Sequence, residues 1–299
     1  MKIAISKITI LWALMLPTVL LGQDSRIQNT VNLVSGDSIF KNIALLEQME
    51  RYTPDNNFEC VEYLISYLNN NGVDTIYLQN YKQGWLPNII AIKYGTIFPD
   101  SIYVLGAHYD SYISGAPGAD DNASGTSGVL EITRMLSNYE FEKTIMFVLF
   151  SGEEIGRHGS KAFTDSIENN NMKISNMINL DMISYNNDID DVSVSICVNS
   201  LSIDLMNTYT NSITTYVPSL KYRIDSTSMI IAAGDHSSFW IKNIPAIMLI
   251  DEIDLFSDNF NNYIHSNNDT LGLSANSKIE AELITKSVVA TLINILKNK

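Results

Sequence analysis

The stretch at residues 144–150 reads TIMFVLF and contains no charged side chain. A short, continuous apolar run of this length predicts a β-strand that is buried on both faces, because a half-exposed strand would alternate apolar and polar residues. Strands buried on both faces are typical of parallel sheets that helices cover on both sides. The segment SGEEIG, residues 151–156, follows at once, so Glu153 and Glu154 are expected directly after this strand.

Apolar segments on either side of this run alternate with stretches of helical spacing. We expect strands at 75–78, 88–94, 102–107, 177–180, 192–198 and 245–250. Helices are expected at 39–49, 58–68, 201–213 and 279–296, from 122–124 to Leu136, and from Ser160 onward, whereas the polar residues 24–37 are interpreted as a lead-in. The alternation predicts an α/β fold with a mixed, mostly parallel central sheet and helices on both faces.

The first 22 residues have the pattern of an export signal. Lys2 and Lys7 precede a mainly apolar run at 8–21, which is shorter than the roughly 20 residues that a membrane-spanning helix needs. Cleavage after Gly22 would start the mature chain near Gln23. We therefore expect residues 1–22 to be a signal peptide and the protein to be exported, periplasmic or secreted, without a stable membrane anchor after signal removal. A retained anchor is the alternative.

Composition and charge limit the number of domains and the kinds of partner that the protein can have. Apolar residues make up 45% of the 299 residues, enough for a sizeable core, and no change in composition marks a domain boundary after the signal. Residues 23–299 are therefore expected to form a single domain. The formal net charge is -14 and no basic stripe with interleaved aromatic residues occurs, which argues against a nucleic-acid partner. Cys60 and Cys197 are the two cysteines, and both a disulfide and two free thiols are compatible with the sequence.

Side chains that bind metals follow several of the predicted strands. They are His108 and Asp110 after 102–107, Glu153 and Glu154 after 144–150, Asp181 after 177–180, and His265 in the loop region after 245–250. Active sites of open α/β sheets lie outside the carboxyl ends of the strands, so these groups are expected at one end of the sheet. Imidazole and carboxylate ligands suit zinc, and a catalytic zinc keeps an open position for water.

Two further patterns point to a dinuclear centre. Two metals roughly 3.5–4 Å apart need a shared carboxylate, and GADDNASG at 118–125 can supply it from one of its two adjacent aspartates. In SGEEIG, one glutamate can bind metal while its neighbour acts as general base. Asp110 lies two positions after His108 and is well placed to accept the second imidazole N–H.

Six motifs jointly resemble one known family. They are GAHYDS (106–111), PGADDNASG (117–125), LFSGEEIG (149–156), INLDMISY (178–185), GDHSSFW (234–240) and YIHSNNDTL (263–271). In this order they resemble the secreted, leucyl-type zinc aminopeptidases of metallopeptidase family twenty-eight, over about residues 88–271. The resemblance implies two Zn²⁺ ions in a zinc exopeptidase domain.

The same resemblance implies a role for each site residue. One zinc would be bound by His108 and Asp181, the other by Glu154 and His265, with Asp121 as the bridge. Glu153 would be the catalytic general base, Asp110 would support His108 by accepting its second imidazole N–H, and a cis peptide would join Asp121 to Asn122.

The chain departs from some of these relatives at a tyrosine that contacts substrate and is flanked by cysteines. The matching stretch, MIIAAGDH at 229–236, has Ile231 near that place and no cysteine, and Tyr263 is a candidate substitute. Within this stretch Asp235 is expected to support the site, and His236 is expected either to support a ligand or to be structural. His158 is interpreted as a solvated turn residue.

The predicted function is therefore zinc-dependent hydrolysis of N-terminal residues from peptides by a metalloexopeptidase. The alternatives are a glutaminyl cyclase of the same fold, a carboxypeptidase of the glutamate-releasing type, and a non-catalytic binding ectodomain. Cyclase-type relatives tend to carry a longer segment after the acidic pair and an aromatic wall. Here only residues 155–158 separate Glu154 from Gly159, and Ile264 precedes His265, which favours the peptidase.

Overall fold

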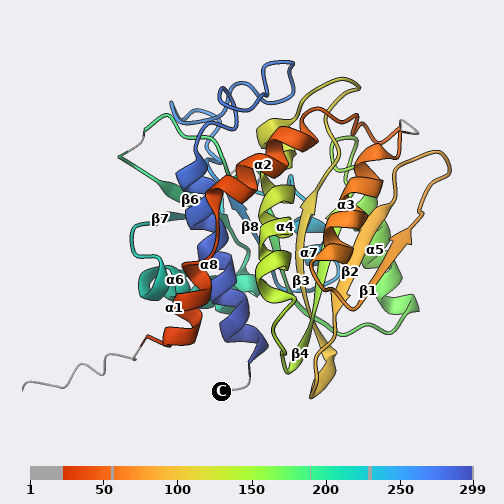
Figure 1. Ribbon diagram of the computed structural model, residues 1–299, viewed down its shortest axis with the longest axis vertical. Coiled ribbons are helices and arrows are strands. Elements are labelled where there is room, and N and C mark those ends of the chain that lie inside the picture. The colour runs from red at the N-terminus through yellow and green to blue at the C-terminus, as the bar shows by residue number, and fades with distance from the viewer. Residues whose placement is uncertain (1–22, 55–56, 189, 228–230, 298–299) are drawn as a thin grey trace, which may run out of the picture.

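The centre of the fold is an eight-stranded sheet in the order β1-β2-β4-β3-β5-β8-β6-β7 (Figure 1). The computed structural model describes residues 23–54, 57–188, 190–227 and 231–297, and the strand count refers to these residues. The strands are β1 Thr75–Gln79, β2 Asn88–Lys93, β3 Phe98–His108, β4 Lys143–Phe150, β5 Ile174–Leu180, β6 Ser193–Cys197, β7 Lys221–Asp225 and β8 Ala246–Ile250. The parallel pairs are β3–β4, β3–β5, β5–β8 and β6–β7. The antiparallel pairs are β1–β2, β2–β4 and β6–β8. The predicted mixed, mostly parallel sheet is confirmed.

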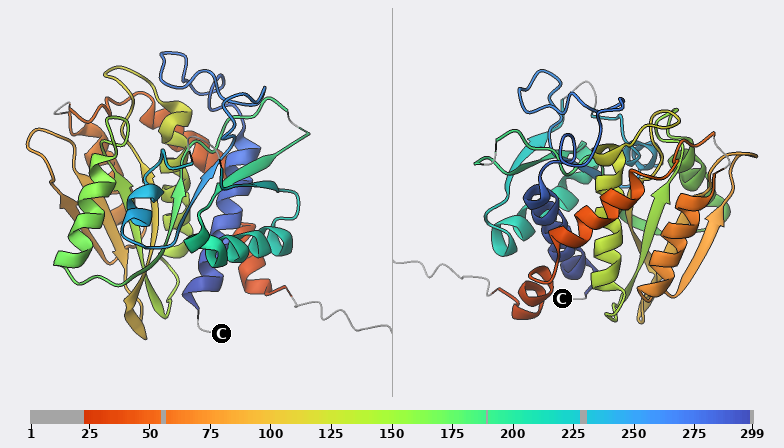
Figure 2. Two further views of the ribbon diagram at one scale, coloured as in Figure 1. Left: turned by 180° about the vertical axis from the view of Figure 1, so that it is seen from behind. Right: turned by 45° about the horizontal axis from the view of Figure 1, so that its top comes forward.

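Helices cover both faces of this sheet, as the front and back views show (Figures 1 and 2). They are α1 Ser25–Val31, α2 Gly36–Leu46, α3 Glu59–Asn70, η1 Ala119–Ser124, α4 Gly125–Leu136, α5 His158–Asn169, η2 Ser200–Ser202, α6 Ile203–Tyr216, α7 His236–Ile241 and α8 Lys278–Leu296. The odd-numbered residues of 145–149 in β4 pack into the core beneath α3, α4 and α8. The even-numbered residues of 146–150 pack into a second core beneath α5 and α7. The run at 144–150 is thus buried on both faces, as its sequence predicts.

The structure differs from the sequence prediction at α1, α7 and β7, and α7 has no counterpart among the expected helices. The interpretation of residues 24–37 as a lead-in is wrong, because Ser25–Val31 form α1. Ile27 and Val31 are one helical turn apart and pack against α8, and the Asp24 side chain caps the helix by accepting the Arg26 N–H at 2.8 Å. The sequence also gave no signal for β7, a short edge strand whose side chains are mostly exposed.

Three other expectations concern the two cysteines, the signal peptide and a membrane anchor. Cys60 in α3 and Cys197 in β6 are both buried and free, so the open question of a disulfide is answered. The predicted signal peptide at 1–22 lies outside the described residues. Within the residues that are described, no helix is long and apolar enough to cross a membrane.

Candidate metal centre and active site

The carboxyl ends of β3, β4 and β5 bring the predicted ligands to one end of the sheet. His108 is the last residue of β3, Glu153 and Glu154 follow β4, and Asp181 follows β5 directly. Between β3 and α4, the short helix η1 carries Asp121, and the peptide bond from Asp121 to the next residue is cis, as the resemblance predicts. His265 reaches the same place from the long loop after β8.

The first group of ligand atoms surrounds His108. Its Nε2 lies 3.3 Å from Oδ1 of Asp121 and 3.4 Å from Oδ1 of Asp181. All three residues are buried, and one ligand atom from each lies within 4.8 Å of the others. This geometry is compact enough for one metal ion to contact all three side chains.

The second group surrounds His265 and shares a residue with the first. Nε2 of His265 lies 3.1 Å from Oδ2 of Asp121 and 3.2 Å from Oε2 of Glu154. The two oxygens of Asp121 therefore face different histidines, which is the arrangement of a bridging carboxylate. The His265 side chain is 44% exposed, whereas that of His108 is 1% exposed, so solvent reaches the centre from the His265 side.

The donor set fits zinc. Imidazole nitrogens and carboxylate oxygens are the ligand types that zinc takes in catalytic sites. In addition, Oε1 of Glu154 is buried without a hydrogen-bond partner, which is costly for a carboxylate unless a cation is close. Glu153 belongs to neither group of ligand atoms, so its carboxylate is free of the metal positions and available for proton transfer.

The structure also distinguishes the two adjacent aspartates of GADDNASG. Asp121 lies between the histidines, whereas Asp120 turns away from them. The Asp120 carboxylate accepts the Ser184 N–H at 2.9 Å and an Asn261 side-chain N–H at 2.7 Å. Asp120 therefore fastens η1 to the segment after β5.

Asp110 supports both the histidine and the glutamate pair. Nδ1 of His108 lies 3.2 Å from the backbone oxygen of Asp110 and 3.6 Å from its carboxylate, so the backbone oxygen is the closer acceptor. The carboxylate also accepts the backbone N–H groups of Glu153 at 3.2 Å and Glu154 at 3.4 Å. Asp110 thereby connects the loops that follow β3 and β4.

Asp269 is a site residue that the sequence reasoning missed. Its buried carboxylate accepts the backbone N–H groups of Asp120 at 2.8 Å and Asp121 at 3.1 Å. Its backbone oxygen accepts the Ala119 N–H at 3.0 Å. Asp269 lies four residues after His265, so it connects the loop of His265 to the loop that carries Asp121. The fixed spacing within YIHSNNDTL is the one signal in the sequence that could have indicated it.

Tyr112 is a second residue that sequence reasoning missed. Its ring stacks on the His265 imidazole with centroids 4.1 Å apart and an interplanar angle of 10°. Stacking fixes the ring plane of an imidazole that is otherwise partly exposed. Tyr263, the candidate substitute named above, instead packs edge-on against Tyr185 at 6.2 Å.

The remaining residues of interest lie around the centre. Asp235 is buried and neither carboxylate oxygen has a hydrogen-bond partner within the described residues. His236 is buried with Nε2 2.7 Å from the Ile231 backbone oxygen, and burial lowers its pKa to about 4, so it is neutral at pH 7. This fits a structural role, one of the two expected for His236. His158 is exposed, as expected, but it is the first residue of α5 and not a turn residue, and its ring lies edge-on to Trp85.

The charges of the buried side chains at the centre favour the binding of a cation. Burial raises the pKa of Glu153 well above its usual range, and it raises the pKa of Glu154 to about 8, with the nearby Asp121 charge adding to the rise. Hydrogen bonds to Asp121 and then Glu154 raise the pKa of His265 to about 10. Carboxylates thus outnumber imidazoles in a buried space, and bound divalent cations would relieve that excess.

An apolar cluster lies beside the centre. It consists of Met182, Cys197, Met248, Ile250 and Ile253, with Ile231 and Ile264 packed against it. Met182 and Ile264 are the sequence neighbours of Asp181 and His265, so the cluster borders both groups of ligand atoms.

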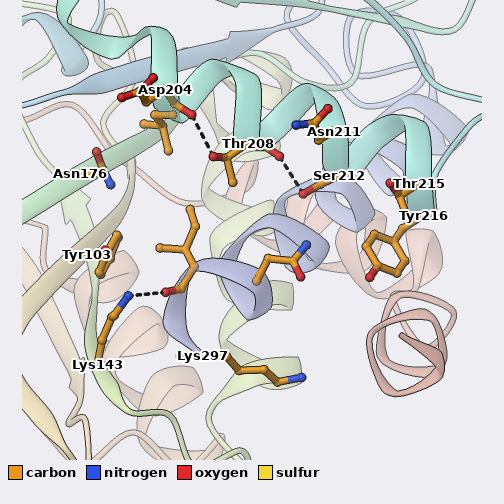
Figure 3. Close-up of a pocket in the computed structure, with 13 residues that line it drawn as sticks. Tyr103, Lys143, Asn176, Asp204, Thr208, Asn211, Ser212, Thr215, Tyr216 and Lys297 are labelled. Carbon is orange, nitrogen blue, oxygen red and sulfur yellow. Dashed lines mark hydrogen bonds between the residues drawn. The ribbon is translucent and has the colours of Figure 1, made fainter. Parts of the chain in front are cut away.

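A cavity of about 880 Å³ lies away from this centre (Figure 3). It is lined mainly by α6 and α8, and by Lys143 at the start of β4, the end opposite to Glu153. Lys143 donates to the Ile295 backbone oxygen at 2.9 Å. The lining holds one carboxylate, that of Asp204, and no histidine or cysteine, so it has no metal-ligand set.

The model of Peptidase family M28 matches residues 88–287, which span every residue of the two ligand groups. This chain belongs to peptidase family M28. A relative from Pyrenophora tritici-repentis, named "Probable zinc metalloprotease", is 34% identical over 129 residues, which are 38% of this chain and 27% of the relative. The chain thus spans about a quarter of that relative. "Probable aminopeptidase YDR415C" from Saccharomyces cerevisiae is 28% identical over 265 residues, covering 82% of this M28 chain and 69% of that protein.

Solved structures share the fold of this M28 chain. LapA from Legionella pneumophila superposes with a TM-score of 0.80 at 21% identity, covering 93% of this chain and 78% of LapA. Glutaminyl cyclase from Porphyromonas gingivalis superposes with a TM-score of 0.71 at 20% identity, covering 88% of this chain and 99% of the cyclase. A structure of LapA carries the name aminopeptidase, so proteins named for two different activities share this fold, and the choice between the two activities depends on the site.

Proposed function

We propose that this protein is a dinuclear zinc aminopeptidase. His108 and Asp181 would hold one zinc ion and Glu154 and His265 the other, with the Asp121 carboxylate available to both. The observation that carries this proposal is the Asp121 carboxylate, whose two oxygens face Nε2 of different histidines at 3.3 and 3.1 Å. Zinc bound there would polarise the scissile carbonyl and lower the pKa of water.

In this proposal Glu153 moves the protons. It accepts a proton from the attacking water and donates it to the departing amine. Its position outside both ligand groups leaves this carboxylate free to act. Asp110 holds the base by accepting its backbone N–H.

The charges around the centre favour an N-terminal substrate. Asp235 is buried close to Asp181, lies outside both ligand groups and has no hydrogen-bond partner among the described residues, so it is a carboxylate that a free substrate ammonium could contact even with zinc bound. The apolar cluster beside the two ligand groups suits an apolar first side chain. Both features support an aminopeptidase over a carboxypeptidase of the glutamate-releasing type.

Glutaminyl cyclase is the second candidate, because a solved cyclase shares the fold. One assay separates the candidates: a leucyl peptide, its N-acetylated form and a peptide with N-terminal glutamine are incubated with the protein, with and without a chelator. Release of leucine from the free peptide alone, abolished by the chelator, is the expected result. Cyclisation of glutamine without leucine release, or hydrolysis of the acetylated peptide from its C-terminus, would refute the proposal.

Export remains part of the proposal. The signal pattern at 1–22 supports action on peptides outside the cytoplasm.

A further inference from the structure

The two flanks of the metal centre differ in chemistry. The sheet order places β5 and β8 on one side of β3, and β4, β2 and β1 on the other. The apolar cluster comes from the β5, β8 and β6 side. The opposite flank is formed by the β1–β2 connection, residues 80–87, and by the segment 151–158 after β4.

This second flank carries an aromatic and basic cluster, which consists of Tyr81, Lys82, Trp85 and His158. The Trp85 ring has Tyr81 edge-on at 6.1 Å and His158 edge-on at 5.0 Å. Nζ of Lys82 lies 3.5 Å from the Trp85 ring centroid, which is a cation–π contact. The rings thereby hold an ammonium group at a defined place instead of leaving it on a freely rotating side chain.

The cluster is fixed to the loop of the general base. The Tyr81 hydroxyl lies 2.8 Å from Oγ of Ser151 and donates to its backbone oxygen at 3.0 Å. Ser151 precedes Glu153 by two residues, and His158 N–H donates to the Gly152 backbone oxygen at 2.9 Å. The aromatic and basic cluster is therefore built on the same turn that carries Glu153.

Lys82 is available to a ligand. Its side chain is exposed, and among the described residues its ammonium group forms no ion pair. Arg157, the neighbouring cation, is used within the protein, because it donates to Oγ of Ser237 at 2.6 Å and to the Ala232 backbone oxygen. In a chain with a net charge of -14, Lys82 is thus an available positive charge next to the loop of the base.

The proposed reaction places the departing part of the substrate beside the aromatic and basic cluster. Glu153 hands its proton to the departing amine, so the residue after the scissile bond must lie on the Glu153 side of the metals. The first side chain of the substrate then points to the apolar cluster, and the departing part of the peptide points to the aromatic and basic cluster. A carboxylate on that departing part would meet Lys82.

We propose that Lys82, held over Trp85, is a specificity-determining residue that binds a carboxylate on the residue after the scissile bond. That carboxylate is the C-terminus of a dipeptide or an acidic side chain at the same position. This inference rests on the proposed aminopeptidase function and makes dipeptides and acidic second residues preferred substrates.

The test compares matched substrates. Leu-Gly is compared with Leu-Gly-amide, and Leu-Asp-amide with Leu-Asn-amide, as the ratio of their kcat/KM values at low ionic strength. The wild-type protein should favour the charged member of at least one pair, and the pair that discriminates identifies the source of the carboxylate. Lys82→Met should lower that ratio about two- to fivefold, the effect of an exposed ion pair, and Lys82→Glu should invert it. Added salt should lower the wild-type ratio.

Controls keep this test falsifiable. Lys173→Glu makes the same charge change at the start of β5, the opposite end of the sheet, and should keep the wild-type ratio. Trp85→Leu should lower the ratio, because Lys82 loses the ring that holds it. Equal ratios in wild type and Lys82→Glu would overturn the inference. Failure of the wild-type protein to hydrolyse any of the four substrates would instead overturn the proposed function.

Discussion

Replacing Asp269 by asparagine tests how the bridge between the two metal sites is held. In the native protein the buried Asp269 carboxylate accepts two consecutive backbone N–H groups, from Asp120 at 2.8 Å and Asp121 at 3.1 Å. Asparagine keeps one accepting oxygen, but its NH₂ group then faces the second backbone N–H. A buried donor left without an acceptor costs about 1–3 kcal/mol.

We expect that cost to lower the affinity for zinc. The loop can relieve the clash by moving, and movement takes Asp121 out of its place between the two histidines. Since 1.4 kcal/mol corresponds to a factor of ten, zinc affinity at the site with Glu154 and His265 should fall by roughly 5- to 150-fold. The loss should exceed that at the site with Asp181, because Asp269 also anchors the loop of His265.

Competition with a chelator of known affinity measures this change, and urea unfolding of the metal-free protein measures stability in parallel. Asp258→Asn is the matched control, because it removes an exposed carboxylate from the same loop. If Asp269→Asn lowered stability while both zinc ions bound as tightly as in the native protein, Asp269 would stabilise the fold without positioning the bridge, and the reasoning above would be refuted.

Three further predictions address the base, a buried acid and the N-terminus. Glu153→Gln should keep the metals and lose about 100- to 10,000-fold in turnover, whereas Glu154→Gln should weaken metal retention; an exchange of these phenotypes would reverse the two assignments. Burial raises the pKa of Glu280 from 4.5 to about 8, so the folded state binds a proton that the unfolded chain releases, and stability should fall as pH rises from about 5 to 8. In urea unfolding, Glu280→Gln should lose up to about 4 kcal/mol less free energy of unfolding than the native protein between these pH values. A variant with the same pH dependence of stability as the native protein would contradict this prediction. N-terminal sequencing of exported protein should begin near Gln23, and an intact Met1 would contradict the predicted cleavage.

Much of the fold could be predicted because its decisive signals are local. The run at 144–150 needs no partner to indicate a strand buried on both faces, and polar residues directly after such strands indicate the active end of the sheet. α1 escaped prediction because its seven residues bury one short stripe around Ile27 and Val31. β7 escaped because an exposed edge strand needs few apolar side chains.

The sequence likewise predicted some features of the candidate site and missed others. The types of the candidate ligands and their place at the strand ends could be predicted from the sequence, but the expectation that Asp121 and not Asp120 is the bridge came from the family resemblance. Both aspartates are buried, and only the three-dimensional structure shows that one faces the histidines while the other faces Ser184. Asp269 accepts the Asp121 backbone N–H from almost 150 residues away, a contact that no local pattern encodes.

Zinc titration of the metal-free protein tests the central claim most directly. A dinuclear centre bridged by Asp121 should bind two zinc equivalents per chain, and Asp121→Asn should weaken both because each histidine shares this carboxylate. Leucine release from an unblocked leucyl peptide, followed in the same titration, should rise as zinc binds and stop at two equivalents. Saturation of both binding and activity at a single equivalent would contradict the account.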